Sequence, residues 1–226
     1  MKPGLKAALL AVGAGLALAA APPGGWTRTI AFTADAGHLV GNPEAPVRLT
    51  EYVRYTCREC AAYNLQSEGV LGLAYLPSGR IAIEVRLLTD SPVDLTTAML
   101  ASCGDPRNFF MNHNALLRGQ SKWMAPLAYA TGTQKQRWKH PDLGTRNRAI
   151  AADLKLYDIM TARGYDRQQV ERCLNDKALA ARLSAASQLA LSAGIAKTPG
   201  FSINGKLLEN THDWAALRPQ LDESLR

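Results

Sequence analysis

Several features that would mark a specialised class of protein are missing from this sequence of 226 residues. There is no long run of lysine and arginine, so the formal net charge of +7 does not favour nucleic acid as a partner. No apolar run reaches the roughly 18 residues needed to span a bilayer. Charged residues make up 20% and hydrophobic residues 47%, which excludes a disordered chain. The length allows one large domain or two small ones.

The sequence also lacks the ligand spacing of a metal site. The four histidines, His38, His113, His140 and His212, form no closely spaced pair with one another or with a cysteine. A zinc site with four ligands usually draws on two tight pairs of ligands. Of the four cysteines, only Cys57 and Cys60 are close together in the sequence, whereas Cys103 and Cys173 are each isolated. This spacing disfavours zinc, and we expect no cofactor.

The first residues, by contrast, are typical of an export signal. Lys2 and Lys6, with no acidic residue, precede an apolar run from Ala7 to Ala21. The small residues of Ala17-Leu18-Ala19 suit a signal peptidase, and the prolines at 22 and 23 end any helix. No cysteine lies near this point, which disfavours a lipid anchor. We therefore expect residues 1–21 to be a cleaved signal peptide and the mature protein to be periplasmic.

Export changes how the isolated cysteines are interpreted. Disulfides persist in oxidising compartments, where two leftover cysteines pair more often than they stay free. We therefore expect Cys103 and Cys173 to form a structural disulfide, with two buried free thiols as the alternative.

Periodicity and turn residues predict strands near both ends of the chain and helices between them. Strands are expected at 26–32, 47–55, 81–87, 201–203 and 206–208, the last two joined by the hairpin signal Asn204-Gly205. Helices are expected from 58 to about 76, from 92 after Ser91, at 106–117 and 148–163, after Asp166, and from 176 to about 194. A last helix is expected after Thr211, which can cap it. Gly69 and Gly72 should weaken or bend the first helix. No strand is expected from 91 to 193.

This order places Cys57-Arg58-Glu59-Cys60 between a buried strand and a helix, and Thr198-Pro199 before the hairpin. The arrangement resembles the thioredoxin superfamily, and the helical block and leader narrow the resemblance to exported DsbA-like thiol-disulfide oxidoreductases. The resemblance begins with the Gly41-Asn42-Pro43 segment and extends to about Leu221. It implies an α/β, thioredoxin-like fold (βαβ followed by ββα) with an all-helical insertion over about 91–193, in one domain covering residues 22–226.

The start of the helix suits redox chemistry at Cys57. Cys57 is expected at the first position of the helix, where free backbone N–H groups and the helix dipole favour a thiolate. A substrate thiolate would attack the Cys57 sulfur, and Cys60, one turn further along, would resolve mixed disulfides in the reverse direction. The alternative to a redox role is a structural Cys57–Cys60 disulfide that only stabilises the end of the helix.

The resemblance implies three supporting residues. Glu51 would be a buried carboxylate that exchanges protons with the inner cysteine, although alternation alone also allows it to face solvent. Pro199 would follow a cis peptide bond that faces the disulfide, whereas the residues alone favour trans. Thr198 would border the sulfurs.

One departure from the family concerns the residues between the cysteines. Arg58-Glu59 replaces the usual Pro-His, so the histidine that helps to stabilise the thiolate is missing. We expect a weaker oxidant than relatives that keep it, because Glu59 places a negative charge near the sulfur.

The function expected from these features is dithiol oxidation of exported protein substrates by a monomer that a membrane redox partner resets. A disulfide isomerase or reductant is one alternative, although no spare segment suggests the dimerisation domain that isomerases commonly need. A copper or zinc carrier using Cys57 and Cys60 is another, although no histidine or methionine ligand lies near the pair in sequence.

Overall fold

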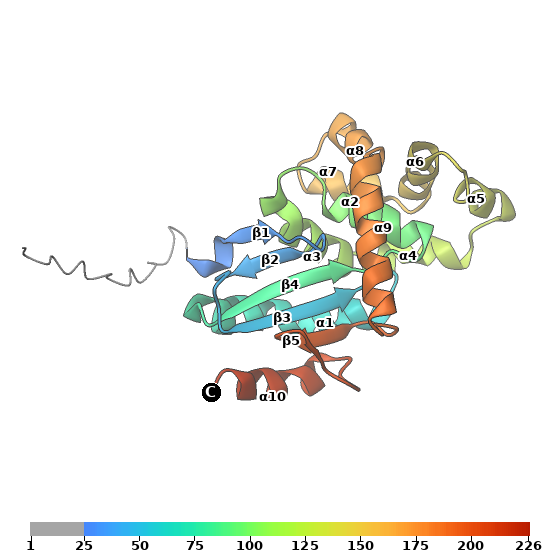
Figure 1. Cartoon of the computed structure of the whole chain (residues 1–226). Coiled ribbons are helices and arrows are strands. Elements are labelled where there is room, and N and C mark those ends of the chain that lie inside the picture. Colours follow the sequence, from blue (N-terminus) through green and yellow to red (C-terminus); the bar gives the residue numbers. More distant parts are fainter. Residues whose placement is uncertain (1–24) are drawn as a thin grey trace, which may run out of the picture.

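The computed structural model describes residues 25–226, so the expected signal peptide over residues 1–21 lies outside the described residues. A six-stranded sheet forms its centre, with the order β1-β2-β4-β3-β5-β6 (Figure 1). The strands are β1 (Ile30–Phe32), β2 (His38–Gly41), β3 (Val47–Val53), β4 (Ile81–Leu87), β5 (Gly200–Ile203) and β6 (Lys206–Leu207). Only β3 and β4 pair in parallel, and the other neighbours are antiparallel.

The parallel pair is joined by helix α1 (Arg58–Val70), as a parallel connection requires a crossover. Both strands are buried along most of their length, although β3 contains Arg48, Thr50 and Glu51 and β4 contains Glu84 and Arg86. After α1 the chain forms a π-helical turn (Leu71–Tyr75) and a 3-10 turn (Leu76–Ser78). The expected weakening at Gly69 and Gly72 is therefore confirmed, because the regular α-helix ends between them.

The region between β4 and β5 is helical, as expected. Its helices are α2 (Pro92–Ala101), α3 (Phe109–Arg118), α4 (Gln120–Ala128), α5 (Gly132–Arg137), α6 (Leu143–Asp153), α7 (Leu156–Ala162), α8 (Arg167–Leu174) and α9 (Lys177–Ser192). Nine residues of α2 are buried, so this helix forms the centre of the block. It begins as predicted, because the Ser91 side chain accepts a hydrogen bond from the Asp94 amide and Pro92 occupies the first turn.

Helices cover both faces of the sheet (Figure 1). Tyr63 of α1 and Leu217 of α10 (Trp214–Ser224) share a buried cluster with Phe201 of β5, so α1 and α10 cover one face. Helix α9 packs against β4 across the opposite face and leads the chain back to β5. The expected α/β fold, with βαβ and ββα units around a helical insertion, is confirmed.

The hairpin between β5 and β6 forms where Asn204-Gly205 predicted it. Both residues have positive φ values, 51° and 80°, as a two-residue hairpin of the type I′ class requires. The Asn204 side chain also accepts a hydrogen bond from the Arg48 amide and donates one to the Pro46 carbonyl. The turn is thus tied to the start of β3.

Three expectations about individual elements were wrong. Residues 26–32 form a 3-10 turn (Trp26–Arg28) before the short strand β1, and β2 was not predicted at all. The single helix expected at 148–163 is divided into α6 and α7, because Lys155 between them has a left-handed backbone with φ of 55°. The last helix is capped by Asp213, whose carboxylate accepts from the Ala216 amide, and not by Thr211.

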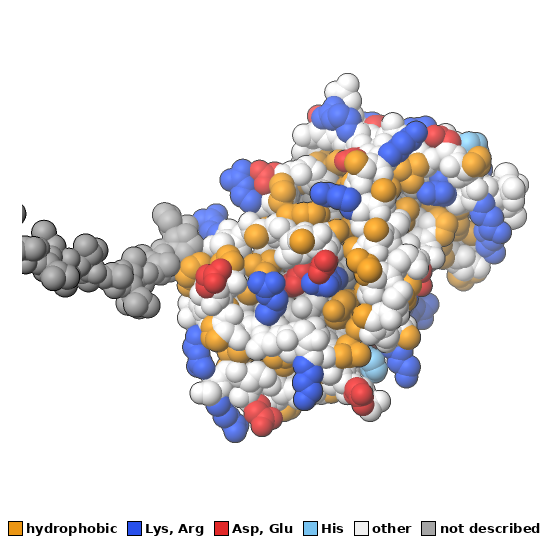
Figure 2. All heavy atoms as spheres, viewed as in Figure 1, with side chains coloured by type: hydrophobic (Ala, Val, Ile, Leu, Met, Phe, Trp, Pro, Cys, Tyr) orange, Lys and Arg blue, Asp and Glu red, His pale blue; other side chains and the backbone are white. Residues whose placement is uncertain are grey.

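Two surface properties bear on possible partners. No helix within residues 25–226 is long and apolar enough to cross a membrane. On the face of these residues shown in Figure 2, lysine and arginine side chains are scattered among neutral and apolar ones and form no continuous basic patch.

Cys103 and Cys173 are joined by a disulfide in the helical block, with their Cα atoms 5.5 Å apart. The bond connects the segment after α2 to α8. Cys103 is fully buried and Cys173 is partly exposed.

Removing this disulfide in the Cys103→Ala/Cys173→Ala double variant is expected to lower the free energy of unfolding by about 2–4 kcal/mol. The bond closes a loop across a sequence separation of 70, which restricts the unfolded chain. Equilibrium unfolding in urea, with the Cys57–Cys60 pair in one redox state, measures the difference. A loss below about 1 kcal/mol would contradict a stabilising role.

Candidate redox site

Cys57 lies at the amino end of α1, where it is the N-cap and not the first helical residue as expected. Its backbone is extended, with φ of −82° and ψ of 117°, and its sulfur accepts a hydrogen bond from the Cys60 amide at 3.1 Å. The sulfur therefore takes the place of the oxygen that normally caps a helix, where the helix dipole also favours negative charge.

The two sulfurs of the pair differ in burial and in acidity. Both are free thiols; Cys57 is partly exposed and Cys60 is fully buried. Hydrogen bonding with the Cys60 thiol, then with the Thr198 side chain and the Cys60 amide, lowers the pKa of Cys57 against the effect of burial. Burial, followed by the hydrogen bond with Cys57 and its charge, raises the pKa of Cys60. The accessible sulfur is therefore the one that ionises first.

The residues between the cysteines are both exposed. The Glu59 carboxylate lies 3.6 Å from the Cys57 sulfur, and its charge raises the pKa of Cys57. No hydrogen bond or ion pair places Arg58 against the sulfur in the described chain. Within this dipeptide, Glu59 therefore disfavours the Cys57 thiolate that the amino end of the helix favours.

The loop before β5 faces the sulfur. The Thr198–Pro199 peptide bond is cis, as the family resemblance implied and the residues alone did not. The Cys57 thiol donates to the Thr198 carbonyl at 3.1 Å. His212 contacts the Pro199 carbonyl through Nδ1 at 2.9 Å, which fixes the far side of the loop.

Glu51 is a buried residue of β3, with 5% of its surface exposed, so the solvent-facing alternative was wrong. The Tyr63 hydroxyl of α1 donates to its carboxylate at 2.6 Å. Burial raises the pKa of Glu51 to about 7, against the lowering effect of this hydrogen bond. A cavity of about 190 Å³ reaches the carboxylate and is also lined by Asn64, Ser67 and Asn114.

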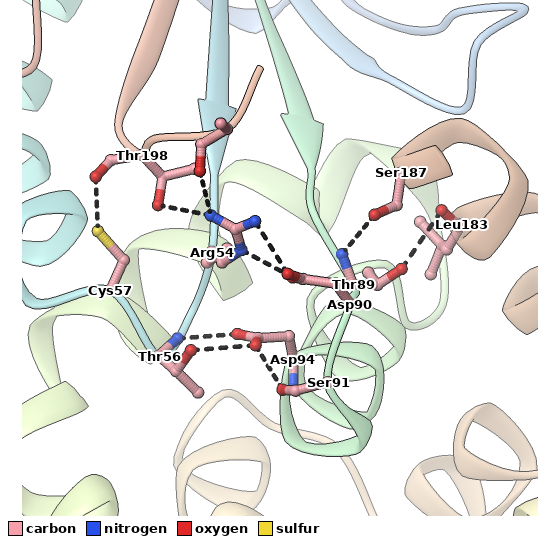
Figure 3. A network of polar contacts seen from close by, with 11 residues as sticks. Arg54, Thr56, Cys57, Thr89, Asp90, Ser91, Asp94, Leu183, Ser187 and Thr198 are labelled. Atoms are coloured by element: carbon pink, nitrogen blue, oxygen red, sulfur yellow. Dashed lines mark hydrogen bonds and ion pairs between the residues drawn. The ribbon is translucent and has the colours of Figure 1, made fainter. Parts of the chain in front are cut away.

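Further residues of the site come from tertiary contacts that the sequence did not reveal. Arg54 binds both oxygens of Asp90 at 2.7 and 2.9 Å (Figure 3). The Asp94 carboxylate accepts from the amide and hydroxyl of Thr56 at 2.9 and 3.0 Å. These partners are 36 and 38 residues apart, and no local pattern connects residues at such separations.

Gln120, at the start of α4, also supports the segment before α1. Its side-chain amide donates to the carbonyls of Tyr55 and Cys57 at 2.7 and 2.6 Å. The helical block therefore contacts the redox pair directly, across 63 residues of sequence.

Within residues 25–226, no group of three or more His, Cys, Asp or Glu side chains is arranged to hold a metal ion.

Comparison with known proteins identifies relatives over most of the chain. The thioredoxin family model matches residues 33–223. A provisionally named protein-disulfide oxidoreductase of Rickettsia typhi is 30% identical over 187 residues, which are 81% of this chain and 61% of that protein. One from Rickettsia prowazekii is 30% identical over 80% of this chain and 59% of its own length. The chain thus spans about three fifths of these relatives.

Solved structures agree in fold. A protein-disulfide isomerase from Novosphingobium aromaticivorans is 45% identical, with a TM-score of 0.82 over 86% of this chain and all of that one. Wolbachia pipientis α-DsbA1 is 21% identical, with a TM-score of 0.61 over 83% of this chain and 89% of that one, and shows the shared fold alone. On the matched domain and the arrangement of its strands, cysteines and helical insertion, the chain belongs to the thioredoxin family, with the fold of its DsbA-like members.

Proposed function

We propose that this protein is a thiol-disulfide oxidoreductase that exchanges disulfides with protein substrates through Cys57 and Cys60. The observation that carries the proposal is the asymmetry of the pair at the end of α1. The partly exposed sulfur of Cys57 has a lowered pKa, and the buried sulfur of Cys60 has a raised one. A nucleophile and leaving group that substrates can reach therefore lies beside a resolving thiol that they cannot.

In the oxidising direction the reaction begins with the Cys57–Cys60 disulfide. A substrate thiolate attacks the Cys57 sulfur, a mixed disulfide forms, and Cys60 leaves with the electron pair and takes up a proton. A second substrate thiolate then attacks the substrate sulfur of the mixed disulfide and releases Cys57 as a thiolate. The substrate loses two electrons to form its disulfide, and the enzyme pair gains them.

Glu51 is proposed to supply the proton that Cys60 takes up and to receive it in the reverse step. Its pKa of about 7 lets the carboxyl hold or release a proton near neutral pH. Burial raises the pKa of Tyr63, and the charges of Glu51 and Cys60 raise it further, which places this tyrosine within the field of both groups. Thr198 and Pro199 are proposed to border the substrate at the exposed side of Cys57.

Oxidation is the proposed direction because the reduced form contains a stabilised thiolate. A dithiol whose thiolate is stabilised is harder to oxidise, so its disulfide is the stronger oxidant. Glu59 works against this stabilisation. The reduction potential of the Cys57–Cys60 pair is therefore proposed to be lower, and its disulfide a weaker oxidant, than in relatives with a histidine at the position of Glu59.

We further propose that residues 1–21 direct export and are removed, and that residues 22–226 act as a single-domain monomer in the periplasm. The Cys103–Cys173 disulfide supports this location, because such bonds persist in oxidising compartments. Catalytic oxidation then requires a redox partner, proposed to lie in the membrane, that accepts the two electrons from the Cys57–Cys60 pair.

A disulfide isomerase is the second candidate, and the name of the Novosphingobium relative favours it. A substrate with scrambled disulfides separates the two activities. An isomerase restores the native pairing without net change in thiols, whereas an oxidant consumes thiols of a reduced substrate.

Cys57→Ser is expected to reduce catalysed insulin reduction and catalysed thiol oxidation to the background rate, because it removes the sulfur that substrates attack. Cys60→Ser is expected to accumulate mixed disulfides, since the resolving thiol is lost. Non-reducing electrophoresis with mass spectrometry detects these adducts. The Cys103→Ala/Cys173→Ala variant serves as the control and should keep its activity. Full activity of Cys57→Ser in both assays would reject the proposed function.

Glu51→Gln is expected to change how stability depends on pH. In the unfolded chain Glu51 titrates near 4.5, whereas the folded protein holds its pKa at about 7. The stability contributed by Glu51 is therefore fully present below about pH 4.5 and is lost as the pH rises to about 7, by up to about 3 kcal/mol. The amide that replaces the carboxyl has no proton to lose, so urea unfolding should show the variant gaining stability over wild type between acidic and alkaline pH.

The control for this experiment is Glu44→Gln, which changes an exposed carboxylate. The difference in unfolding free energy between Glu44→Gln and wild type should be the same at acidic and at alkaline pH. If the difference for Glu51→Gln were equally independent of pH, that result would contradict a raised pKa at Glu51.

Glu59→His is expected to lower the pKa of Cys57 and to make the disulfide a stronger oxidant. The substitution removes a carboxylate that lies 3.6 Å from the sulfur and introduces a possible cation. Thiolate absorbance during a pH titration gives the pKa, and equilibration with glutathione gives the potential. Glu223→His, on the surface of α10, is the matched control. No shift, or a shift towards weaker oxidation, would disprove the argument.

A further inference from the structure

A groove between helices α1 and α4 begins beside the redox pair. The two helices pack against each other, and the groove between them encloses about 590 Å³. The residues that line it include the buried side chains of Ala61 and Leu117 and the exposed side chains of Leu65 and Tyr129. All of the lining residues lie between positions 58 and 129, whereas the loop with the cis peptide bond precedes β5. The groove is therefore separate from that loop.

Two features attach the groove to the redox cysteine. Arg58, which lines it at the amino end of α1, directly follows Cys57 in the chain. Gln120, which also lines it, donates its side-chain amide to the Cys57 carbonyl at 2.6 Å. From Arg58 to Leu65 the groove follows α1 for about 10 Å, at a rise of about 1.5 Å per residue, and an extended chain covers that distance with about three residues. A chain segment in the groove would therefore be short and would lie beside the sulfur that substrates attack.

The groove presents apolar side chains to solvent. Leu65 is 64% exposed and Tyr129, which follows α4, is 86% exposed. Ala62, Ala125 and Ala128 are also exposed and extend this apolar surface between the two larger side chains. Contiguous exposed apolar surface marks sites where proteins bind partners, and tyrosine and arginine are enriched among the residues that contribute most to such binding.

The two charged residues that line the groove are both basic. Arg118 is paired with Glu68, whereas Arg58 forms no ion pair within residues 25–226. A guanidinium binds a carboxylate well, because its N–H groups match the two oxygens. The groove is therefore complementary to a segment that has apolar side chains and a carboxylate. A second copy of this chain suits it less, because the formal net charge of +7 makes copies repel each other.

We propose that the groove between α1 and α4 binds the segment of a substrate protein that adjoins the reacting cysteine. Apolar side chains of this segment lie against Leu65 and Tyr129, and a carboxylate pairs with Arg58. The preferred substrates are thus proteins with an acidic and apolar stretch beside a cysteine. This inference rests on the proposed function, because a substrate cysteine is what places such a segment beside Cys57.

A peptide that cannot react tests the binding by itself. The probe is a short peptide in which leucines and one glutamate adjoin a serine that replaces the cysteine. Titration of the isotope-labelled full chain, followed by NMR, is expected to shift the signals of Leu65, Tyr129 and their neighbours most. Shifts confined to the loop before β5, or no shifts at the highest soluble peptide concentration, would overturn the proposal.

The apolar contribution is tested by Leu65→Gln and Tyr129→Ser. Each is expected to weaken binding of the probe peptide about fivefold, because apolar surface is no longer buried on binding. Both side chains are largely exposed, so the fold should be retained, and urea unfolding checks this. Leu189→Gln on α9 is the matched control, since Leu189 is also 64% exposed and does not line the groove. Unchanged affinity in both groove variants, or an equal loss in the control, would overturn the proposal.

Arg58→Gln tests the charge. It is expected to weaken binding of the probe peptide about threefold and to leave a peptide with glutamine in place of the glutamate unaffected. Arg80→Gln is the control, because Arg80 is an exposed arginine before β4 that does not line the groove. An equal effect of Arg58→Gln on both peptides would overturn the pairing with a carboxylate.

Two further measurements separate this inference from other outcomes. Exchange with dithiothreitol tests the proposed function alone, because this small dithiol has no segment to place in the groove. A protein inactive in that assay would refute the function, whereas binding of the serine peptide would still be measured. Sedimentation velocity shows whether copies associate. A dimer that Leu65→Gln dissociates would assign the groove to a second copy and overturn the proposal.

Discussion

The hydrogen bond from the Cys60 amide to the Cys57 sulfur is the interaction on which the site depends. It exists because Cys57 is the N-cap of α1, where backbone amides have no partner within the helix. The same geometry places Cys60 one turn along on the buried side, fully covered by the core. A difference in chemistry between two identical side chains therefore arises from their positions at one end of a helix.

The sheet keeps this end of the helix in place. Strand β3 lies between its parallel partner β4 and the antiparallel β5, so the segments that follow β3 and β4 and the one that precedes β5 meet at one edge. Cys57, Asp90 and Thr198 come from these three segments and lie within one hydrogen-bonded network (Figure 3). Strands β3 and β4 hold this network in place, since both are central in the sheet and buried along most of their length.

Opposing electrostatic effects meet at the Cys57 sulfur. Hydrogen bonding with the Cys60 thiol, the Thr198 side chain and the Cys60 amide favours its thiolate, whereas burial and the Glu59 carboxylate disfavour it. The favourable groups belong to the folded frame, and Glu59 is an exposed side chain close to the cysteine in sequence. The reduction potential of such a cysteine pair can therefore be changed by substituting a surface residue, without any change in the fold.

Much of the fold was predictable because it depends on local patterns. The apolar positions of β3 and β4, the Asn204-Gly205 turn and the Ser91 cap each follow from a few adjacent residues. Strand β2 and the break at Lys155 were missed, since pairing with β4 and a left-handed backbone depend on the surrounding structure.

The sequence by itself determined which residues are proposed to carry the exchange chemistry, because Cys57 and Cys60 lie one turn apart at the start of one predicted helix. Family resemblance was needed to single out Glu51 and Pro199, as alternation left the face of Glu51 open and proline residues usually follow trans bonds. Only the tertiary structure decided that Arg54, Asp90 and Thr198 form one network, in which Arg54 is 36 and 144 residues from its two partners along the chain. Contacts over such separations are set by how strands pair in the sheet, and no local stretch of sequence contains that information.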